Sequence, residues 1–360
     1  MSLAWPLIHA GSASIESRSL ADARQAITQI EKSQSPLVGY FSYDLAPLFE
    51  SLPTCAVDAD LQLPLIAVAP ARPDKAAPLP RRGSTSSRIV TSTFDRQAYE
   101  QTVQRCIDYI RAGDIFQVNL SQRFTIETDE TPAAIWQRLQ QQSASRFGAF
   151  LDFGDYAILS NSPELFLRVE RLPDGRRKIT NRPIKGTRPR IDGMEAELRD
   201  SEKDKAELAM IVDLQRNDLG RICEIGSVIV TEPRVIESLP TVYHGVATIE
   251  GILREGVSLY DTLRATFPCG SVTGCPKIRA MQIIDELEPV RRGPYCGAIG
   301  WIDPPSGTME LNVAIRTMVL KGHRAYVAVG GGIVADSVPT HEYDETMVKA
   351  QALFRALGVA

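Results

Sequence analysis

The sequence lacks the patterns that mark several large classes of protein. No run of eighteen consecutive apolar residues occurs in the chain, so no transmembrane helix is predicted. Residues 1–18 lack the basic start and the long apolar centre of a secretory signal. The net charge is −4, which argues against a nucleic-acid-binding surface or a polybasic membrane anchor. We therefore expect a cytoplasmic protein with neither nucleic-acid nor membrane partners.

Short motifs of several enzyme classes are missing too. The sequence has no G-x-S-x-G motif, no H-E-x-x-H motif and only four histidines, which disfavours hydrolases and zinc enzymes. The stretch GSVTGCPK at 270–277 has the wrong spacing for a phosphate-binding loop. The cysteines form no C-x-x-C pair, so reduced thiols are the simplest interpretation. These cysteines are Cys55, Cys106, Cys223, Cys269, Cys275 and Cys296.

The residues that are present indicate a mixed fold. The chain is 44% hydrophobic and 23% charged, as in ordinary globular proteins, and its length permits one large domain or two. Strands occur in groups with helices between them, which predicts an α+β fold with mainly antiparallel sheets. Residues 1–80 are interpreted as a short N-terminal segment of strands, a helix and a proline-rich connector.

Residues 95–126 predict a helix followed by an alternating strand. Asp95 is a suitable helix cap, and apolar residues recur at helical spacing as far as Gly113. Apolar and polar residues then alternate over 115–126. The polar face consists of Gln117, Asn119, Ser121 and Arg123. It is either the water-facing side of a sheet or the lining of a cleft.

Lys185 lies in the stretch TNRPIKGTRPR, at 180–190. A hairpin turn predicted at 174–175 places this lysine just past the end of the returning strand. Pro183 and Gly186 restrict the backbone around it, in what reads as a turn. The lysine is either a solvated loop residue or a group placed for chemistry. Three arginines with no assigned role flank it: Arg182, Arg188 and Arg190.

Two carboxylates stand out in the predicted helices. Glu207 falls on an apolar stripe of a long helix expected over 195–217, and a buried carboxylate is costly unless it is paired, protonated or bound to a metal. A salt bridge to Lys203 or to a neighbouring arginine is the alternative. Glu345 begins a second acidic helix and precedes Lys349 by four residues. Mg²⁺ favours a few carboxylates from separate elements.

The triple glycine at 330–332 directly follows an apolar strand. It either makes a tight turn or lets backbone amides approach a small anion closely. Together these features suggest a small anionic ligand, a divalent cation held by glutamates, and a lysine on restricted backbone.

Six sequence blocks resemble, in order, the signature blocks of the chorismate-utilising enzymes. They are LSNSPELFLRV, RPIKGTRPR, KDKAELAMIVDLQRNDLGRI, FPCGSVTGCPKIRAMQIIDELEPVRRGPYCGAIGWI, AIRTM and GGGIVADSVPTHEYDET. The resemblance runs from about Phe94 to the C-terminus. It implies a single chorismate-binding domain over 1–360, with 94–360 as the catalytic core. It also implies two large antiparallel sheets packed face to face with helices outside.

The resemblance further implies chorismate, a dianion, as substrate and Mg²⁺ as cofactor. Its motifs match Glu207 and Glu345 to the metal-binding carboxylates, and Glu164 to the general acid/base. The matching substrate-binding positions are Arg316, Lys349, Gly331, Gly332, Ser271, His244 and Gln117. Trp301 stands in the same pocket-lining block, where many members have tyrosine.

Two positions bear on the kind of chorismate enzyme. Members that use water carry a lysine at the position of Gln117, and a glutamine cannot serve as that base. Anthranilate synthases read PIAGT where this chain reads PIKGT. A lysine there marks the aminodeoxychorismate synthase component I subfamily, in which the lysine amine attacks the substrate ring.

Ammonia is expected from a separate glutamine amidotransferase subunit, because no glutamine-hydrolysing segment is recognised in the sequence. Two alternatives remain, an anthranilate synthase component I and a non-catalytic chorismate-binding subunit. The lysine of PIKGT counts against the first. Four intact groups count against the second: Glu164, Lys185, Glu207 and Glu345.

Overall fold

The structure is a computed structural model that describes residues 5–52, 56, 60–71, 88–239 and 242–359. Most of the predicted proline-rich connector lies outside the described residues, as does Cys55. The other five cysteines are free thiols. No helix within the described ranges is both long and apolar enough to cross a membrane.

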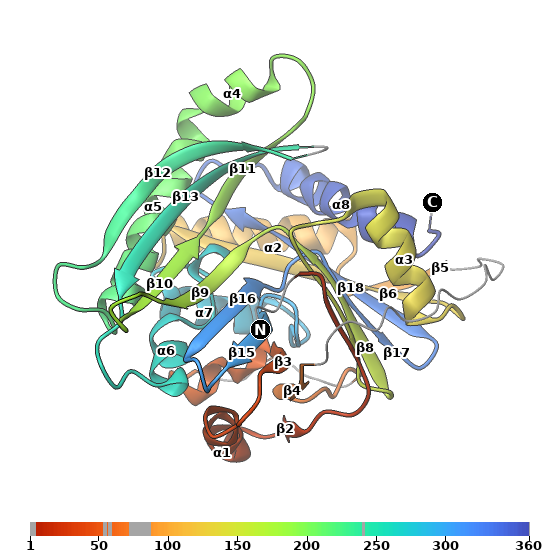
Figure 1. Cartoon of the computed structure of the whole chain (residues 1–360). Helices are drawn as coiled ribbons and strands as arrows, with labels where there is room; N and C mark the ends of the chain where they lie inside the picture. The colour runs from red at the N-terminus through yellow and green to blue at the C-terminus, as the bar shows by residue number, and fades with distance from the viewer. Residues whose placement is uncertain (1–4, 53–55, 57–59, 72–87, 240–241, 360) are drawn as a thin grey trace.

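Two large sheets form the framework (Figure 1). The eight-stranded sheet contains β1 (Leu7–Ala10), β5 (Arg88–Ser92), β6 (Gln117–Glu127), β7 (Phe147–Asp152), β8 (Tyr156–Ser162), β14 (Gly274–Cys275), β17 (Thr317–Lys321) and β18 (Arg324–Ile333). The ten-stranded sheet contains β2 (Ile15–Ser17), β3 (Leu37–Phe41), β4 (Ile66–Pro70), β9 (Leu165–Arg171), β10 (Arg177–Arg182), β11 (Ile184–Pro189), β12 (Ile229–Ser238), β13 (Val242–Ile252), β15 (Ala298–Asp303) and β16 (Thr308–Val313). Among the described strands, β1 and β7 pair in parallel and the other pairs are antiparallel.

Eight helices accompany the sheets in the part of the chain that the structure describes. They are α1 (Leu20–Glu31), α2 (Arg96–Arg111), α3 (Pro132–Ser143), α4 (Met194–Asp200), α5 (Glu202–Gly220), α6 (Leu259–Thr266), α7 (Lys277–Leu287) and α8 (Pro339–Ala356), with short 3₁₀ turns η1 (Tyr43–Leu48) and η2 (Gly270–Val272). Helices α3 and α8 share an apolar cluster with the eight-stranded sheet, whereas α5 packs on β11, β12 and β13. The predicted α+β fold of two antiparallel sheets is confirmed.

Two local predictions are confirmed. The Asp95 side chain accepts a hydrogen bond from the Ala98 amide and caps α2, and Gly175 has a φ of 86° in the turn between β9 and β10.

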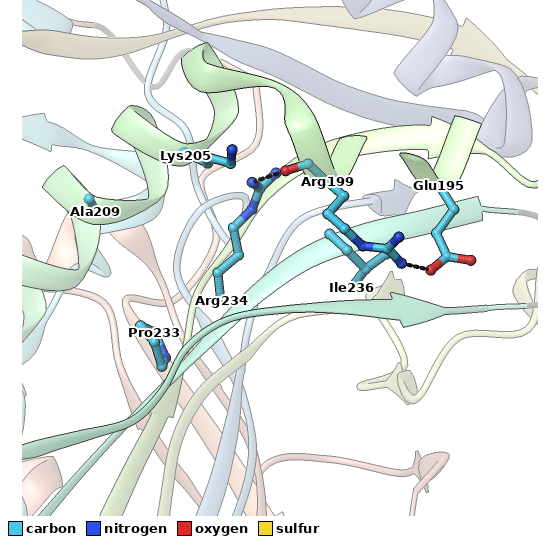
Figure 2. A pocket seen from close by; sticks show the side chains of 7 residues that line it. All are labelled: Glu195, Arg199, Lys205, Ala209, Pro233, Arg234 and Ile236. Carbon is cyan, nitrogen blue, oxygen red and sulfur yellow. Dashed lines mark hydrogen bonds and ion pairs between the residues drawn. The ribbon is translucent and has the colours of Figure 1, made fainter. Parts of the chain in front are cut away.

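The prediction of a single helix over 195–217 is wrong. Ser201 leaves the helical conformation, with a ψ of 108°, and its hydroxyl caps α5 by accepting from the Asp204 amide. The resulting elbow between α4 and α5 borders a cavity of about 500 Å³ against β12 (Figure 2).

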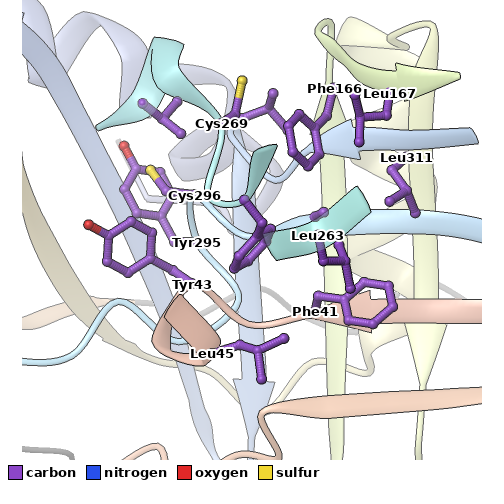
Figure 3. Close-up of a cluster of buried hydrophobic side chains, with 14 of the residues drawn as sticks. Phe41, Tyr43, Leu45, Phe166, Leu167, Leu263, Cys269, Tyr295, Cys296 and Leu311 are labelled. Atoms are coloured by element: carbon purple, nitrogen blue, oxygen red, sulfur yellow. The ribbon is translucent and has the colours of Figure 1, made fainter. Parts of the chain in front are cut away.

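The cores lie between the sheets and under the helices. Tyr40 of β3 and Tyr156 of β8 meet through their hydroxyls at 3.1 Å, in a cluster drawn from both sheets. A larger cluster joins the ten-stranded sheet to its helices, with Phe41, Phe166 and Leu263 among its members (Figure 3). Consecutive residues of β9 and β10 are buried on both faces, which holds these strands, and hence the start of β11, in one position.

Candidate active site

Lys185 lies in a β-bulge. Along the β11–β13 pair, Ile184 is opposite Val246 and Thr187 is opposite His244, so Lys185 and Gly186 together face Gly245. Gly186 has a φ of 81°, a region that favours glycine. The turn expected from the Pro and Gly spacing is therefore wrong, because the chain re-enters the sheet at Ile184 and absorbs the extra residue within a strand. A bulge re-aims a side chain, here the lysine.

The Lys185 amine and the Gln117 amide converge beside Gly332. A Cβ atom at Gly332 would lie 2.8 Å from Gln117 Nε2 and 3.1 Å from Lys185 Nζ. The triple glycine forms part of strand β18 and pairs with β6, with Gly332 opposite Asn119, so the tight turn, one of the two alternatives, is wrong. Glycine is needed here because a side chain would fill the space between the amine and the amide.

Polar atoms near this space have no hydrogen-bond partner among the described residues. Gln117 is 0% exposed, and within the described residues neither its Oε1 nor its Nε2 makes a hydrogen bond. The buried Nδ2 of Asn119 is in the same state there. Buried amides without partners cost free energy, so these groups are suited to a polar ligand. The polar face of β6 is thus buried rather than water-facing, and Asn119 was missed as a site residue although it shares that face with Gln117.

Glu164 is a buried acid next to the bulge. It is 3% exposed, and burial raises the pKa of its carboxyl to about 7 although the Ser271 hydroxyl, Lys185 and the Ile184 amide act in the other direction. Ser271 Oγ donates to Glu164 Oε1 at 2.6 Å. A carboxyl that keeps much of its proton at neutral pH can act as a general acid.

Burial also lowers the pKa of Lys185. The positive charge of Lys349 acts in the same direction, and the carboxylates of Glu207, Glu164 and Glu345 oppose it. A lowered lysine pKa increases the fraction of free amine at neutral pH, and the free amine is the nucleophilic form.

Carboxylates and a second lysine surround Gly331. A Cβ atom there would lie 3.3 Å from Glu342 Oε2, 3.7 Å from Glu345 Oε1 and 3.8 Å from Lys349 Nζ. Lys349 Nζ lies 2.6 Å from Glu345 Oε1 and donates to the Gly330 carbonyl at 2.9 Å. Glycine at this position leaves room for a ligand beside an ammonium group.

Glu207 and Glu345 fit a magnesium site in their chemistry. The expected alternative partner, Lys203, is 3.9 Å from Glu207 and 60% exposed, so this ion pair contributes little. The charge of Lys203 also acts on Glu342 and Glu345, which places one cation among three carboxylates. No group of three or more metal-ligating side chains occurs among the described residues. Two carboxylates completed by water and substrate oxygens are a usual arrangement for Mg²⁺.

His244 lies opposite Thr187 of β11, and the charge of Arg316 acts on its imidazole. Arg316 is a non-glycine residue with a φ of 52°, and its Nη1 donates to the Lys349 carbonyl at 3.1 Å. His244 Nδ1 is 2.8 Å from Thr187 Oγ1. Burial, followed by the charge of Arg316, lowers the pKa of His244 to about 4, so this imidazole is neutral at neutral pH. The Arg316 guanidinium reaches the backbone of the helix that carries Lys349, and two such cations suit a dianionic ligand.

Trp301 is placed apart from these groups. It lies on β15 opposite Val38 and Glu310 and packs against the cluster that contains Tyr40. Within the residues that the structure describes, its buried indole Nε1 makes no hydrogen bond, so no such bond joins it to Lys185 or Glu164. Its role in substrate binding stays a prediction, whereas the other predicted residues gather around the glycines of β18 and the bulge of β11.

Comparison with known proteins decides the family. Residues 7–355 match the family of chorismate binding enzymes.

The chain belongs to this family.

It is 47% identical over 275 residues to anthranilate synthase component 1 of Pseudomonas aeruginosa, covering 75% of this chain and 55% of that protein. It is 44% identical over 289 residues to an aminodeoxychorismate synthase of Streptomyces griseus, covering 79% of this chain and 39% of that protein. The chain thus spans about half, or less, of the length of these curated relatives.

A solved structure supports the same placement. The crystal structure of anthranilate synthase component I from Streptococcus pneumoniae superposes with a TM-score of 0.78 at 33% identity, covering 89% of this chain and 81% of that one. The expected family and fold are confirmed. The similarity to enzymes of both names does not distinguish between their activities, so that choice depends on the residues of the site.

Proposed function

We propose that the protein is component I of an aminodeoxychorismate synthase. It would convert chorismate and ammonia to 4-amino-4-deoxychorismate, in the synthesis of para-aminobenzoate and folate. The observation that carries the proposal is the Lys185 amine, which has a lowered pKa and lies with the Gln117 amide beside Gly332. An alanine in the bulge, as in the PIAGT block of anthranilate synthases, would supply no nucleophile there.

The proposed reaction uses groups of this chain in two steps. The free Lys185 amine attacks ring carbon C2, the C4–O bond breaks, and protonated Glu164 gives its proton to the leaving hydroxyl, which departs as water. Ammonia then attacks C4, the ring double bonds that shifted in the first step shift back, and the bond between C2 and the lysine nitrogen breaks, which releases the amine. The proton lost from the added nitrogen returns to the Glu164 carboxylate. The enolpyruvyl ether stays on the ring, so no pyruvate is released.

Charged groups around the bulge would hold the substrate during these steps. Arg316 and Lys349 would bind its carboxylates, together with backbone amides at Gly331 and Gly332. Glu207 and Glu345 would hold Mg²⁺, which, when bound, fixes the ring carboxylate and draws electron density from the ring. Gln117 cannot act as a base, which disfavours water as the nucleophile.

Product analysis tests the proposal. The purified chain is incubated with chorismate, Mg²⁺ and ammonium, and the products are identified by mass. We expect 4-amino-4-deoxychorismate without pyruvate. Anthranilate with pyruvate would establish the alternative that the Pseudomonas aeruginosa relative favours, and unchanged chorismate would indicate a non-catalytic binding subunit. Glutamine in place of ammonium is expected to support turnover only when an amidotransferase subunit is added.

Lys185→Ala tests the covalent step. We expect this variant to lose most amination activity and to bind chorismate still, since Arg316, Lys349 and the metal carboxylates remain. Lys178→Ala is the matched control, because Lys178 is also partly buried and pairs with Glu250 at 2.7 Å. Full activity in Lys185→Ala would refute the covalent mechanism.

A further inference from the structure

The bulge that carries Lys185 is packed against the elbow between α4 and α5. A Cβ atom at Gly186 would lie 2.6 Å from Leu198 Cδ1 of α4 and 2.9 Å from Asp204 Cγ of α5. The backbone of the bulge is therefore in direct contact with both helices. Any movement of the elbow changes where the bulge, and with it the lysine, can lie.

Arg188 ties the strand of the bulge to both helices. Its Nε is 2.9 Å from Glu197 Oε1 on α4, and its Nη2 is 3.0 Å from Asp204 Oδ2 on α5. The Asp204 side chain is 13% exposed, so this ion pair is better shielded from solvent than an ordinary surface pair. The sequence assigned no role to Arg188, and these contacts indicate a structural one, the attachment of β11 to the two helices.

Arg234 holds the elbow from strand β12. Its guanidinium donates to the carbonyl of Arg199 at 3.0 Å (Figure 2). It also donates to the carbonyl of Leu198, so both bonds are made to the last turn of α4. The same side chain reaches the bulge, because a Cβ atom at Gly245 would lie 3.4 Å from Arg234 Nε and 2.6 Å from the Lys185 carbonyl oxygen. Within the described residues Arg234 Nε is buried and makes no hydrogen bond, which is the cost of this placement.

We propose that Arg188, Asp204 and Arg234 are positioning residues that fix the Lys185 amine by clamping its bulge to the α4–α5 elbow. The inference rests on the proposed role of Lys185 as nucleophile. None of the three touches the space beside Gly332, so they act through the backbone of the bulge. A nucleophile displaced by about 1 Å loses roughly a hundredfold in rate, and the clamp prevents such a displacement.

Three variants test the clamp: Asp204→Asn, Arg188→Lys and Arg234→Lys. Asp204→Asn removes the charge at nearly constant volume. Arg188→Lys can form only one of the two ion pairs at a time, so its kcat should lie between that of Asp204→Asn and that of the wild type. Glu130→Gln is the matched control. Glu130 pairs with Arg138 of helix α3, and the two side chains are 7% and 26% exposed, close to the values for Asp204 and Arg188. This pair is not at the bulge.

Two readouts are combined. In Asp204→Asn and Arg234→Lys we expect kcat for amination to fall at least tenfold with KM for chorismate changed by less than about twofold. Labelling of Lys185 by acetic anhydride, followed by peptide mass mapping, should rise severalfold relative to Lys178 in the same sample, because a loosened bulge exposes the amine. General unfolding would instead raise the labelling of both lysines together.

The two readouts keep this inference separate from the proposed function. If the wild type forms no 4-amino-4-deoxychorismate, the proposed function fails and the labelling of Lys185 alone decides the clamp. Labelling of Lys185 in Asp204→Asn and Arg234→Lys that equals that of Glu130→Gln overturns the inference, whether or not kcat changes. Selectively raised labelling supports it.

Discussion

At the scale of single residues, the absence of a side chain at Gly332 shapes the site. We predict that Gly332→Ala lowers the affinity for chorismate at least tenfold, because the added methyl would lie 2.8 Å from Gln117 Nε2 and 3.1 Å from Lys185 Nζ. The melting temperature should change little, since this glycine does not have a positive φ. Calorimetric titration with chorismate measures the affinity.

Gly220→Ala is the control for this substitution. A Cβ atom at Gly220 meets nothing within 4 Å, so chorismate binding should equal that of the wild type. Unchanged affinity in Gly332→Ala would mean that the ligand does not use the space beside this strand.

A second residue-scale prediction concerns Glu164 and pH. Its pKa is raised by burial to about 7 from 4.5, so its contribution to stability is complete below about pH 4.5 and is lost as the pH rises through 7. Glu164→Gln cannot ionise, and it should exceed the wild type in free energy of unfolding by about 3 kcal/mol at pH 8.5, with the difference vanishing near pH 4.

Urea unfolding of both proteins at several pH values measures this difference. The amination activity of Glu164→Gln should be lower than that of the wild type, because the glutamine amide has no acidic proton to give to a leaving hydroxyl. A stability difference that does not depend on pH would contradict the buried-acid interpretation.

At the scale of elements, a buried ion pair joins strand, turn and helix behind the site. Arg292 and Glu288 are 5% exposed each and lie 2.7 Å apart. Arg292 also donates to the carbonyls of Val272 and Asn119, and Glu288 accepts from the Ser121 amide and hydroxyl. The pair therefore fixes β6, which carries Gln117, against the turn η2, which carries Ser271.

Breaking this pair should be costly. We predict that Arg292→Ala lowers the free energy of unfolding by about 3–5 kcal/mol, because it leaves Glu288 charged and buried without compensation. Arg96→Ala is the comparison, since the exposed pairs of Arg96 with Glu100 and Asp344 are screened by solvent and its loss should be much smaller. Equal losses in the two variants, measured by urea unfolding, would contradict the structural role of the buried pair.

At the scale of the whole molecule, the proposed metal site depends on two helices far apart in the sequence. Glu207 comes from α5 on the ten-stranded sheet and Glu345 from α8 on the eight-stranded sheet. We predict that EDTA abolishes amination and that Mg²⁺ restores it. Glu207→Gln and Glu345→Gln should each weaken Mg²⁺ binding to the protein by at least about tenfold.

Calorimetric titration of each protein with Mg²⁺ provides a measurement that does not need turnover. Glu286→Gln is a suitable control, because Glu286 pairs with Arg105 on the surface. Full activity in EDTA, or unchanged Mg²⁺ affinity in both variants, would exclude these two carboxylates as metal ligands.

The sequence by itself determined what depends on neighbours in the chain. The cap and length of α2, the hairpin at Asp174 and Gly175, and the strand β6 follow from capping, turn chemistry and alternation. The resemblance of its motifs also indicated the family and most of the site residues. At Ser201 two local signals compete, because the apolar spacing continues through this residue while its hydroxyl can cap a new helix. The spacing alone did not reveal the break between α4 and α5.

Only the tertiary structure decided how distant segments meet. The glycines of β18 are part of a sheet because β6 supplies their hydrogen-bond partners. Lys185 lies in a bulge because it and Gly186 are both opposite a single residue of β13. The pKa values of Glu164 and Lys185 are shifted by burial, which no spacing in the sequence reports. The contacts of Arg188 and Arg234 with the elbow depend on packing between three separate elements, so they were visible only once the chain was folded.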